Sequence, residues 1–332
     1  MKVLLYSEAL NKIKNSGLGK AIRHQQKALE YVNIPYTLNE NDEYDLLHIN
    51  TYFLKSYFLA KKAKRKGKKI VYHAHSTEED YKNGFILSKQ TSKLFKKWLI
   101  KCYSLGDVIV TPTLYSKKLL EGYKGLEDKK IYAVSNGIEL DFMKKDIKKG
   151  KEFRTKYGYT KDDKVIIGIG LYIERKGIVD FVELAKRMPQ YKFIWFGYSP
   201  LCATTKKVRD AVNTKLDNLV FAGYVDSTEI KGAMSGADLY LFPTLEETEG
   251  IPIIEACACK QNAIIRDIPI FDGWLKDGVN VYKAKDIDEF EKKINMFFEG
   301  KLPSLVEEAY KVAEQRDLKK VGIELKKIYE SI

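Results

Sequence analysis

Short apolar segments alternate with longer amphipathic ones along the whole of this 332-residue chain. Apolar runs of about four to eight residues are typical of buried parallel strands, and the amphipathic segments between them are typical of covering helices. The alternation begins twice, each time with a strand, a glycine-marked turn and a helix. It therefore predicts an α/β protein with two Rossmann-like domains, in which ligands bind at the carboxyl ends of the strands. The predicted strands are residues 2–7, 45–50, 69–74, 107–111 and 130–134, and then 164–170, 191–197, 220–223, 237–242 and 263–266.

The composition of the middle of the chain suggests where the two domains meet. Residues 139–160 are polar, rich in lysine and poor in apolar periodicity, which is typical of a hinge. We therefore expect an N-terminal domain at 1–145, a linker at 146–160, a C-terminal domain at 161–316 and a final lysine-rich helix at 317–332. The two domains are expected to face each other across a cleft.

An acidic loop leads from the strand at 237–242 into an apolar helix. The loop contains Glu247, Thr248, Glu249 and Gly250, and Glu255 follows within the helix. The start of a helix offers free backbone N–H groups and a partial positive charge to an anion. Carboxylates in the loop and further along the helix are suited to bind sugar hydroxyls. The alternative interpretation is surface charge that complements the helix dipole.

Five motifs, taken together, resemble the retaining glycosyltransferases of family 4, which have the two-domain GT-B fold. They occur in the family's order, over essentially the whole chain, and are Ser16-Gly17-Leu18-Gly19, Asn136-Gly137-Ile138, Lys176-Gly177, Glu247 and Glu255. Longer stretches at 19–26, 73–80 and 193–197 are similar to bacterial enzymes that add a second hexose to glucosyldiacylglycerol. In this fold the final helix crosses back onto the first domain.

The resemblance implies that the second domain binds a nucleotide sugar and that the first binds the acceptor. Lys176 matches a lysine that grips the donor diphosphate, but Leu171 stands where the family has an arginine. Either Arg175 reaches the phosphate instead, or Lys176 and backbone N–H groups hold it. Glu247 would bind the sugar hydroxyls and Glu255 the ribose. The remaining donor-binding candidates are Gly17, Gly19, Thr248, Glu249 and Gly250.

Two histidines, His73 and His75, end the strand predicted at 69–74. We expect them to point in opposite directions, so that only one ring faces a ligand. The resemblance selects His75, whose family counterpart lies beside the anomeric carbon, and makes His75, Glu247 and Lys176 the candidate catalytic residues. Two alternatives stay open: a zinc pair, which lacks a third ligand at a recognisable spacing, and a structural histidine held by hydrogen bonds.

A basic amphipathic helix is predicted at 85–103. Its apolar arc comprises Leu94, Phe95, Trp98, Leu99 and Cys102, and Lys93, Lys96, Lys97 and Lys101 lie on the other side. Such a helix with tryptophan is suited to a membrane interface, where each lysine near anionic lipid contributes about 1 kcal/mol. The same pattern suits an ordinary helix that packs on a sheet. A nearby lysine-rich run at 61–69 favours the membrane, and the choice stays open.

The positive charge of the chain is confined to its first half. The formal net charge is +13; residues 1–150 contain 29 Lys and Arg against 16 Asp and Glu, whereas the rest is balanced. This asymmetry predicts an anionic partner, and a membrane surface is preferred to nucleic acid because no nucleic-acid-binding motif accompanies it. No apolar run has the length of a membrane span, and the N-terminus is too short for a signal peptide. We expect a cytoplasmic protein that is peripheral on the inner face of the cell membrane.

No metal site is predicted, and no cofactor besides the UDP-sugar donor is expected to be required. Asp286-Ile287-Asp288 resembles a metal-binding Asp-x-Asp motif, but it precedes an amphipathic helix, so a helix cap is preferred. Hydride transfer fits poorly, because the first strand is followed by Gly-x-Gly rather than Gly-x-Gly-x-x-Gly.

The resulting functional prediction is a retaining α-hexosyltransferase. It would move galactose, or failing that glucose, from a UDP-sugar to α-glucosyldiacylglycerol, with front-face attack on the donor. The alternatives are a family 4 enzyme that acts on a soluble or polysaccharide acceptor, and a non-catalytic sugar- or lipid-binding module whose donor site is weakened at Leu171.

Overall fold

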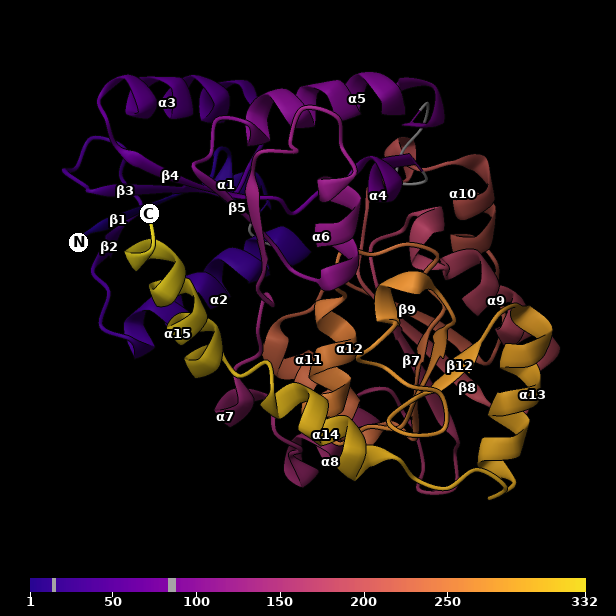
Figure 1. Ribbon diagram of the computed structural model, residues 1–332. Helices are drawn as coiled ribbons and strands as arrows, with labels where there is room; N and C mark the ends of the chain where they lie inside the picture. The colour runs from indigo at the N-terminus through magenta and orange to yellow at the C-terminus, as the bar shows by residue number, and fades with distance from the viewer. Residues whose placement is uncertain (14–15, 83–87) are drawn as a thin grey trace. The chain divides into compact units, whose positions relative to one another are not determined.

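The computed structural model describes residues 1–13, 16–82 and 88–332, and it divides into two compact units (Figure 1). The N-terminal unit comprises Met1–Tyr81, Lys89–Glu139 and Arg316–Ile332, and the C-terminal unit is formed mainly by Leu140–Gln315. Each unit contains a six-stranded sheet whose neighbouring strands are all parallel. The predicted α/β class with two Rossmann-like sheets is therefore confirmed.

The sheet of the N-terminal unit has the strand order β2-β1-β3-β4-β5-β6. Every residue of β1, β3 and β5 is buried, because helices cover both faces of the sheet. The edge strand β2 has only two residues and gave no apolar signal in the sequence. The strands are β1 Val3–Tyr6, β2 Tyr36–Thr37, β3 Leu46–Ile49, β4 Lys69–His73, β5 Val108–Thr111 and β6 Lys130–Ala133.

Helices α3 and α5 pack on one face of this sheet, and α2 and α15 pack on the other (Figure 1). Successive side chains of a strand point to opposite faces, so Leu4 and Leu47 contact the first pair of helices, whereas Val3 and Leu46 contact the second. The helices of this unit are α1 Leu10–Ile13, α2 Gly17–Tyr31, α3 Leu54–Arg65, α4 Glu78–Lys82, α5 Ser88–Tyr103, α6 Leu114–Glu121 and α15 Leu318–Glu330. The predicted start of α5 at Phe85 lies outside the described residues.

The C-terminal helix α15 belongs to the N-terminal unit because it packs closely on α2. Gly322 lies at the crossing, where an added Cβ atom would be 2.3 Å from the carbonyl oxygen of Ala28. Only glycine allows two backbones to approach so closely. Leu318, Val321 and Leu325 of α15 complete the core on this face of the sheet.

The sheet of the C-terminal unit has the strand order β12-β11-β10-β7-β8-β9. Its core surrounds Trp195 on β8, which contacts Phe181 edge-on at a centroid distance of 5.0 Å. The strands are β7 Val165–Ile169, β8 Lys192–Phe196, β9 Leu219–Gly223, β10 Leu239–Phe242, β11 Ala263–Arg266 and β12 Tyr282–Ala284. The α-helices are α7 Leu140–Met143, α8 Ile147–Lys156, α9 Ile178–Arg187, α10 Lys206–Val212, α11 Ser227–Gly236, α12 Ile251–Ala258, α13 Ile287–Phe298 and α14 Val306–Glu314, and the short 3-10 helices are η1 Glu174–Lys176, η2 Leu201–Ala203 and η3 Pro269–Phe271.

Residues 146–160, which the sequence suggests as a linker, contain the whole of helix α8 and belong to the C-terminal unit. Asp146 caps the helix by accepting a hydrogen bond from the Lys149 backbone N–H at 3.0 Å. Arg154 binds the carbonyl of Gly236 at 2.7 Å and the Asp238 carboxylate at 2.8 Å. The helix lacks apolar periodicity because these polar contacts hold it on α11.

No helix within residues 1–13, 16–82 and 88–332 combines the length and apolar character that crossing a membrane requires.

The Asp-x-Asp motif lies at the start of α13, where Asp286 is the N-cap. Its Oδ1 accepts a hydrogen bond from the Glu289 backbone N–H at 2.9 Å, which confirms the predicted cap. Asp288 forms a separate, solvent-exposed ion pair with Arg187 at 2.7 Å.

We expect Asp286→Ala to lower the free energy of unfolding by about 1 kcal/mol, because it removes the cap of α13. Asp286→Asn keeps a capping oxygen but removes the carboxylate, so its stability should stay near that of the wild type. Urea denaturation followed by circular dichroism measures both. Equal losses in the two variants would show that charge, and not the cap, holds the start of the helix.

Candidate functional site

Two loops of the C-terminal unit, predicted separately from the sequence, meet at a buried ion pair. The Lys176 ammonium contacts Oε1 of Glu247, and the Thr244 hydroxyl donates to the same oxygen at 3.0 Å. The Arg175 guanidinium lies 3.9 Å from the other carboxylate oxygen. The side chain of Glu247 is 6% exposed, and those of Arg175 and Lys176 are each 15% exposed. The structure thus brings together three of the candidate donor-binding residues.

The charge of Glu247 is maintained by its neighbours. Burial alone would raise the pKa of this carboxyl group, because it penalises the charged form. Lys176 and Arg175, together with hydrogen bonds from Lys176 and Thr244, outweigh that effect and hold the pKa of Glu247 below its usual value. Glu247 is therefore a carboxylate that accepts hydrogen bonds at physiological pH.

The backbone holds these two loops together. Gly177 has φ +75°, and an added Cβ atom would lie 2.2 Å from the carbonyl oxygen of Pro243, so glycine is required here. The carbonyl of Arg175 accepts a hydrogen bond from the Leu245 N–H at 2.7 Å, and the Thr244 hydroxyl, whose one proton it shares with Glu247, lies 3.0 Å away. The close approach follows from the parallel pairing of β7 with β10, whose carboxyl ends carry the two loops.

Arg175 turns its guanidinium toward the acidic loop. Nη1 donates to the carbonyl of Glu246 at 3.0 Å, and the buried Nε has no hydrogen-bond partner among the residues that the structure describes. Leu171, at the position of the family's arginine, is half-buried. A guanidinium is thus present beside Lys176, although it comes from a different position of the loop.

The acidic loop continues into α12, where Glu255 is 2% exposed. Thr248 is half-buried, Glu249 is 1% exposed, and Gly250 precedes the helix with φ +91°. Burial, followed by the charges of Glu255 and Glu247, raises the pKa of the Tyr240 hydroxyl well above its ordinary value. Both Glu247 and Glu255 are therefore close enough to the Tyr240 hydroxyl of β10 to disfavour its ionisation.

In the N-terminal unit, the rings of His73 and His75 stack face to face, with centroids 3.9 Å apart and planes 6° from parallel. The expectation that they point in opposite directions is wrong. Side chains repeat every two residues along a strand, so positions 73 and 75 share a face, and it is residue 74 that points the other way. His73 is 2% exposed and His75 is half-buried.

A continuous hydrogen-bonded network orients His75. Its Nε2 donates to Oδ1 of Asn50 at 2.9 Å, and Nε2 of Gln25 donates to that same oxygen at 2.8 Å. Gln25 also donates to Nδ1 of His73 at 2.8 Å, and Nε2 of His48 lies 3.1 Å from that same nitrogen. Nδ1 of His48 then accepts from the Tyr329 hydroxyl of α15. Because His48 and His73 each accept a hydrogen bond on one ring nitrogen, both of these imidazoles are neutral.

Burial keeps these histidines unprotonated. It lowers the pKa of His48 to about 3, with a smaller contribution from His75, and it lowers the pKa of His75 to about 3. The pKa of His73 falls well below its usual value for the same reason. A neutral imidazole offers one donor and one acceptor nitrogen, so His75, whose Nε2 donates to Asn50, has Nδ1 as an acceptor.

Gly17 and Gly19 do not form the predicted turn between β1 and a helix. They lie in the first turn of α2, and the Ser16 hydroxyl caps this helix by accepting from the Gly19 N–H at 3.2 Å. The short helix α1 separates them from β1. The sequence alone could not show this, because two glycines weaken any helical pattern.

The four lysines predicted to form the basic face of α5 differ in their exposure. Lys93, Lys97 and Lys101 are exposed, but Lys96 forms an ion pair with the buried Glu78 at 3.2 Å and lies 4.0 Å from the centre of the Tyr123 ring. Lys96 is therefore not part of an exposed basic surface.

The residues of the predicted apolar arc of α5 also differ in their burial. Leu99 and Cys102 are fully buried against the sheet, as expected for an ordinary packed helix, whereas Leu94 is 71% exposed. Trp98 is half-buried, and its indole N–H donates to the carbonyl of Tyr52 at 2.7 Å.

Sequence reasoning missed Thr244 and the network partners Gln25, His48, Asn50 and Tyr329. A signal was present for two of them, since His48 and Asn50 are polar residues within or directly after an apolar strand. Buried polar side chains in such positions need hydrogen-bond partners, so they indicate a network.

Known proteins are similar to this chain over its whole length. The model of a family described as "Glycosyl transferases group 1" matches residues 150–316, and "Glycosyltransferase Family 4" matches residues 23–142. The chain is 40% identical to the processive diacylglycerol alpha-glucosyltransferase of Acholeplasma laidlawii over 332 residues, which cover 100% of this chain and 98% of that one. It is 23% identical to the alpha-galactosylglucosyldiacylglycerol synthase of Streptococcus pneumoniae, with 78% of this chain and 71% of that one covered.

Among solved structures, the fold is similar to that of Anabaena HepE in complex with UDP and glucose. The TM-score is 0.80 with 17% sequence identity, and all of both chains is covered. The sucrose-phosphate synthase of Thermosynechococcus elongatus is similar with a TM-score of 0.73 at 14% identity, over 87% of this chain and 73% of that one.

The buried histidine network predicts a specific pH dependence. Because the pKa values of His48 and His75 in the folded state lie below the unfolded value of about 6.5, the folded protein binds fewer protons there. The free energy of unfolding should therefore fall as the pH is lowered through the window from about 6.5 toward 3.

Nuclear magnetic resonance of histidine-labelled protein tests this directly, since the chain has only four histidines. We expect no ring resonance of His48, His73 or His75 to titrate between about pH 5 and pH 7.5, whereas the same resonances in urea should titrate near pH 6.5. A titration midpoint near 6.5 for His75 in the folded protein would contradict the assignment of a neutral network.

Proposed function

The chain belongs to the family 4 glycosyltransferases, and from this premise we propose that it transfers a hexose from a UDP-sugar to a diacylglycerol glycolipid. The observation that carries this proposal is the likeness over the full chain to a processive diacylglycerol α-glucosyltransferase. The likeness to a galactosyl enzyme is weaker and shorter, which favours glucose over galactose as the sugar transferred. The proposed acceptor is glucosyldiacylglycerol.

The C-terminal unit is proposed to bind the donor. UDP is present in the similar HepE structure, and Lys176 and Arg175 provide the positive charge that a diphosphate requires. Glu247 would accept hydrogen bonds from hydroxyls of the transferred sugar, and Glu255 from the ribose. When the nucleoside diphosphate leaves, negative charge develops on it, and Lys176 would stabilise that charge in a site that excludes water.

The proposed reaction retains the anomeric configuration. The bond between the anomeric carbon and the diphosphate oxygen breaks, the acceptor hydroxyl oxygen attacks from the same face, and its proton passes to the leaving diphosphate. His75 is proposed to lie beside the reacting carbon as a neutral hydrogen-bonding group, held in its tautomer by Asn50. A neutral imidazole avoids repulsion with the positive charge that develops at that carbon.

The acceptor lies in a membrane, so the N-terminal unit is proposed to bind an anionic membrane surface from the cytoplasmic side. The confinement of the net positive charge to the first half of the chain supports this. Of the α5 lysines, Lys93, Lys97 and Lys101 are proposed to contribute, since they are exposed. No metal or further cofactor is proposed to take part, because cationic side chains can neutralise the diphosphate.

Lys176→Ala and Glu255→Ala should each weaken the binding of UDP by roughly ten- to a hundredfold, because each removes a charged hydrogen bond. Isothermal titration calorimetry with UDP measures the change. Lys186→Ala is the matched control, since Lys186 is an exposed lysine of α9 in the same unit that pairs with Glu183 at the surface. Unchanged affinity in both site variants would contradict the donor assignment, provided that circular dichroism shows them folded.

The transferase activity itself is tested with radiolabelled UDP-glucose and UDP-galactose, each offered with diacylglycerol, glucosyldiacylglycerol and a soluble glucoside. We expect a lipid-linked product from UDP-glucose with glucosyldiacylglycerol, formed equally well in the presence of EDTA. A product on the soluble glucoside with none on either lipid would refute the glycolipid acceptor. Loss of activity in EDTA with rescue by Mg²⁺ or Mn²⁺ would refute the metal-free mechanism.

A further inference from the structure

Large apolar side chains are exposed on the N-terminal unit where the start of α3 approaches α5. Phe53 and Leu54 are 37% and 63% exposed, and Leu94 on α5 is 71% exposed. Phe58, further along α3, is 62% exposed. Neighbouring apolar groups that remain in water at this density are typical of a binding surface.

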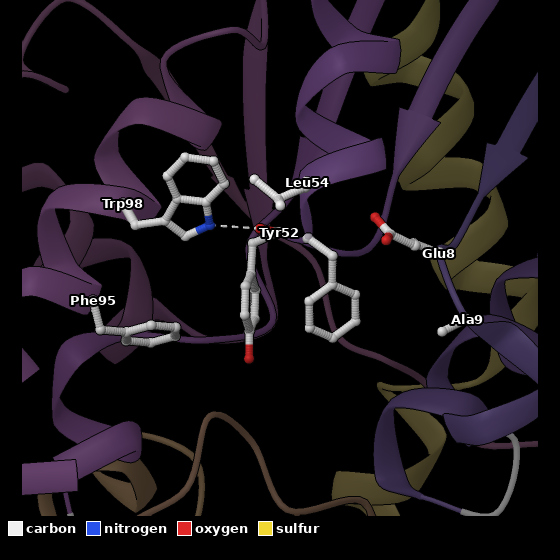
Figure 2. Close-up of a pocket in the computed structure, with 7 residues that line it drawn as sticks. Glu8, Ala9, Tyr52, Leu54, Phe95 and Trp98 are labelled. Atoms are coloured by element: carbon white, nitrogen blue, oxygen red, sulfur yellow. Dashed lines mark hydrogen bonds between the residues drawn. The ribbon is translucent and has the colours of Figure 1, made fainter. Parts of the chain in front are cut away.

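This surface is hollowed by two grooves. The first, with a volume of about 570 Å³, lies between Glu8 and Ala9 on one side and residues 52–54, Phe95 and Trp98 on the other. Figure 2 shows the rings of Tyr52, Phe95 and Trp98 around this space, with Glu8 and Ala9 across from them. The second groove, of about 500 Å³, lies along α5 between Tyr81 and Leu94, and Lys97 and Lys101 also line it.

Phe95 and Trp98 line both grooves and therefore form a ridge between them. The ridge is fixed in place. The Trp98 indole donates to the carbonyl of Tyr52 at 2.7 Å, as the dashed line in Figure 2 marks. The Phe95 ring stacks on Tyr81 at 4.0 Å and meets the edge of Tyr52 at 5.2 Å. Both grooves are thus preformed, which lowers the entropic cost of binding.

The walls of the first groove offer little to a polar ligand. The Glu8 carboxylate already accepts hydrogen bonds from the Ser56 N–H at 3.0 Å and the Ser56 hydroxyl at 3.3 Å. The one polar atom of the Trp98 side chain is bound to Tyr52. Most of the remaining lining is aromatic and aliphatic surface, which favours an apolar ligand.

We infer that the two grooves hold the two acyl chains of one diacylglycerol acceptor, one chain on each side of the Phe95–Trp98 ridge. The inference rests on the proposed function and adds a site for the lipid part of the substrate. Two adjacent apolar grooves with a common ridge match a ligand that has two chains joined at one end. Lys97 and Lys101 lie at the second groove, where they complement the anionic headgroups of lipids that surround the acceptor.

The test uses acceptors that share a glucosylglycerol headgroup and carry no, one or two octanoyl chains, offered as monomers without vesicles. We expect kcat/KM with UDP-glucose to rise with the first chain and again with the second, by about tenfold or more for each. Leu54→Gln, which alters only the first groove, and Leu94→Gln, which alters only the second, should each abolish the gain from one chain. Both residues are exposed, so neither change should affect folding.

Ile323→Gln is the matched control, because Ile323 is 48% exposed on α15, which packs on the opposite face of the same sheet. It should leave all three values of kcat/KM unchanged. A kcat/KM that does not depend on the chains, or that falls equally in all three variants, would overturn the two-groove site. If no acceptor received a hexose, the proposed function would be refuted instead. The two-groove site would then be tested separately, by measuring the binding of the lipid.

Binding is followed by the fluorescence of Trp98 and monomeric glucosyldiacylglycerol with brominated octanoyl chains. Bromine in the grooves should quench this residue, and the quenching should disappear in Trp98→Phe, because the other two tryptophans lie in the C-terminal unit. Quenching by monomers supports the site whether or not transfer occurs. Quenching that requires brominated phospholipid vesicles would overturn it and show a surface that inserts into the bilayer as a whole.

Discussion

The buried contact between Glu247 and Lys176 is the interaction on which the geometry of the C-terminal unit's site depends. It joins the loop after β7 to the loop after β10, and the backbone hydrogen bonds around Arg175 reinforce it. Removing two charges from water is costly, and a pair so deeply placed stabilises a protein little compared with apolar packing. Under the proposed function the pair has another use, since a diphosphate would compete for the lysine and sugar hydroxyls would compete for the carboxylate.

The polar cluster of the N-terminal unit follows a different principle. His48, His73 and His75 are linked to Gln25, Asn50 and Tyr329 by hydrogen bonds between neutral groups, and burial suppresses protonation. The neutral network fixes the orientation of the histidine rings without adding a net charge. The ion pair of the other unit fixes the orientation of its side chains and also places charges there. This division suits a reaction in which negative charge leaves with the donor while the acceptor is a neutral hydroxyl.

Much of the fold is predictable because each sheet is parallel and covered on both faces. Apolar runs such as residues 46–49 and 165–169 can be recognised without knowing what they contact. The edge strands β2 and β12 were not predicted, because strands of two or three residues are too short to show an apolar pattern. Helix α8 was not predicted either, because polar contacts of Arg154 and a cap hold it and its sequence has no apolar period. Motifs indicated the candidate site residues, but they did not indicate which side chains these residues contact. Pairings such as Lys176 with Glu247, Lys96 with Glu78 and His48 with Tyr329 join distant positions, which no local pattern encodes.

The place of α15 has a consequence for how the protein is made. The Tyr329 hydroxyl reaches His48 across 281 positions of sequence, and Gly322 lets α15 press against the backbone of α2. A ribosome delivers the chain from its N-terminus, so residues 140–315 are complete and free to fold while α15 is still unsynthesised. Until then one face of the first sheet lacks its last helix, and the histidine network lacks its last hydroxyl. The unit whose synthesis begins first is therefore completed only after the other.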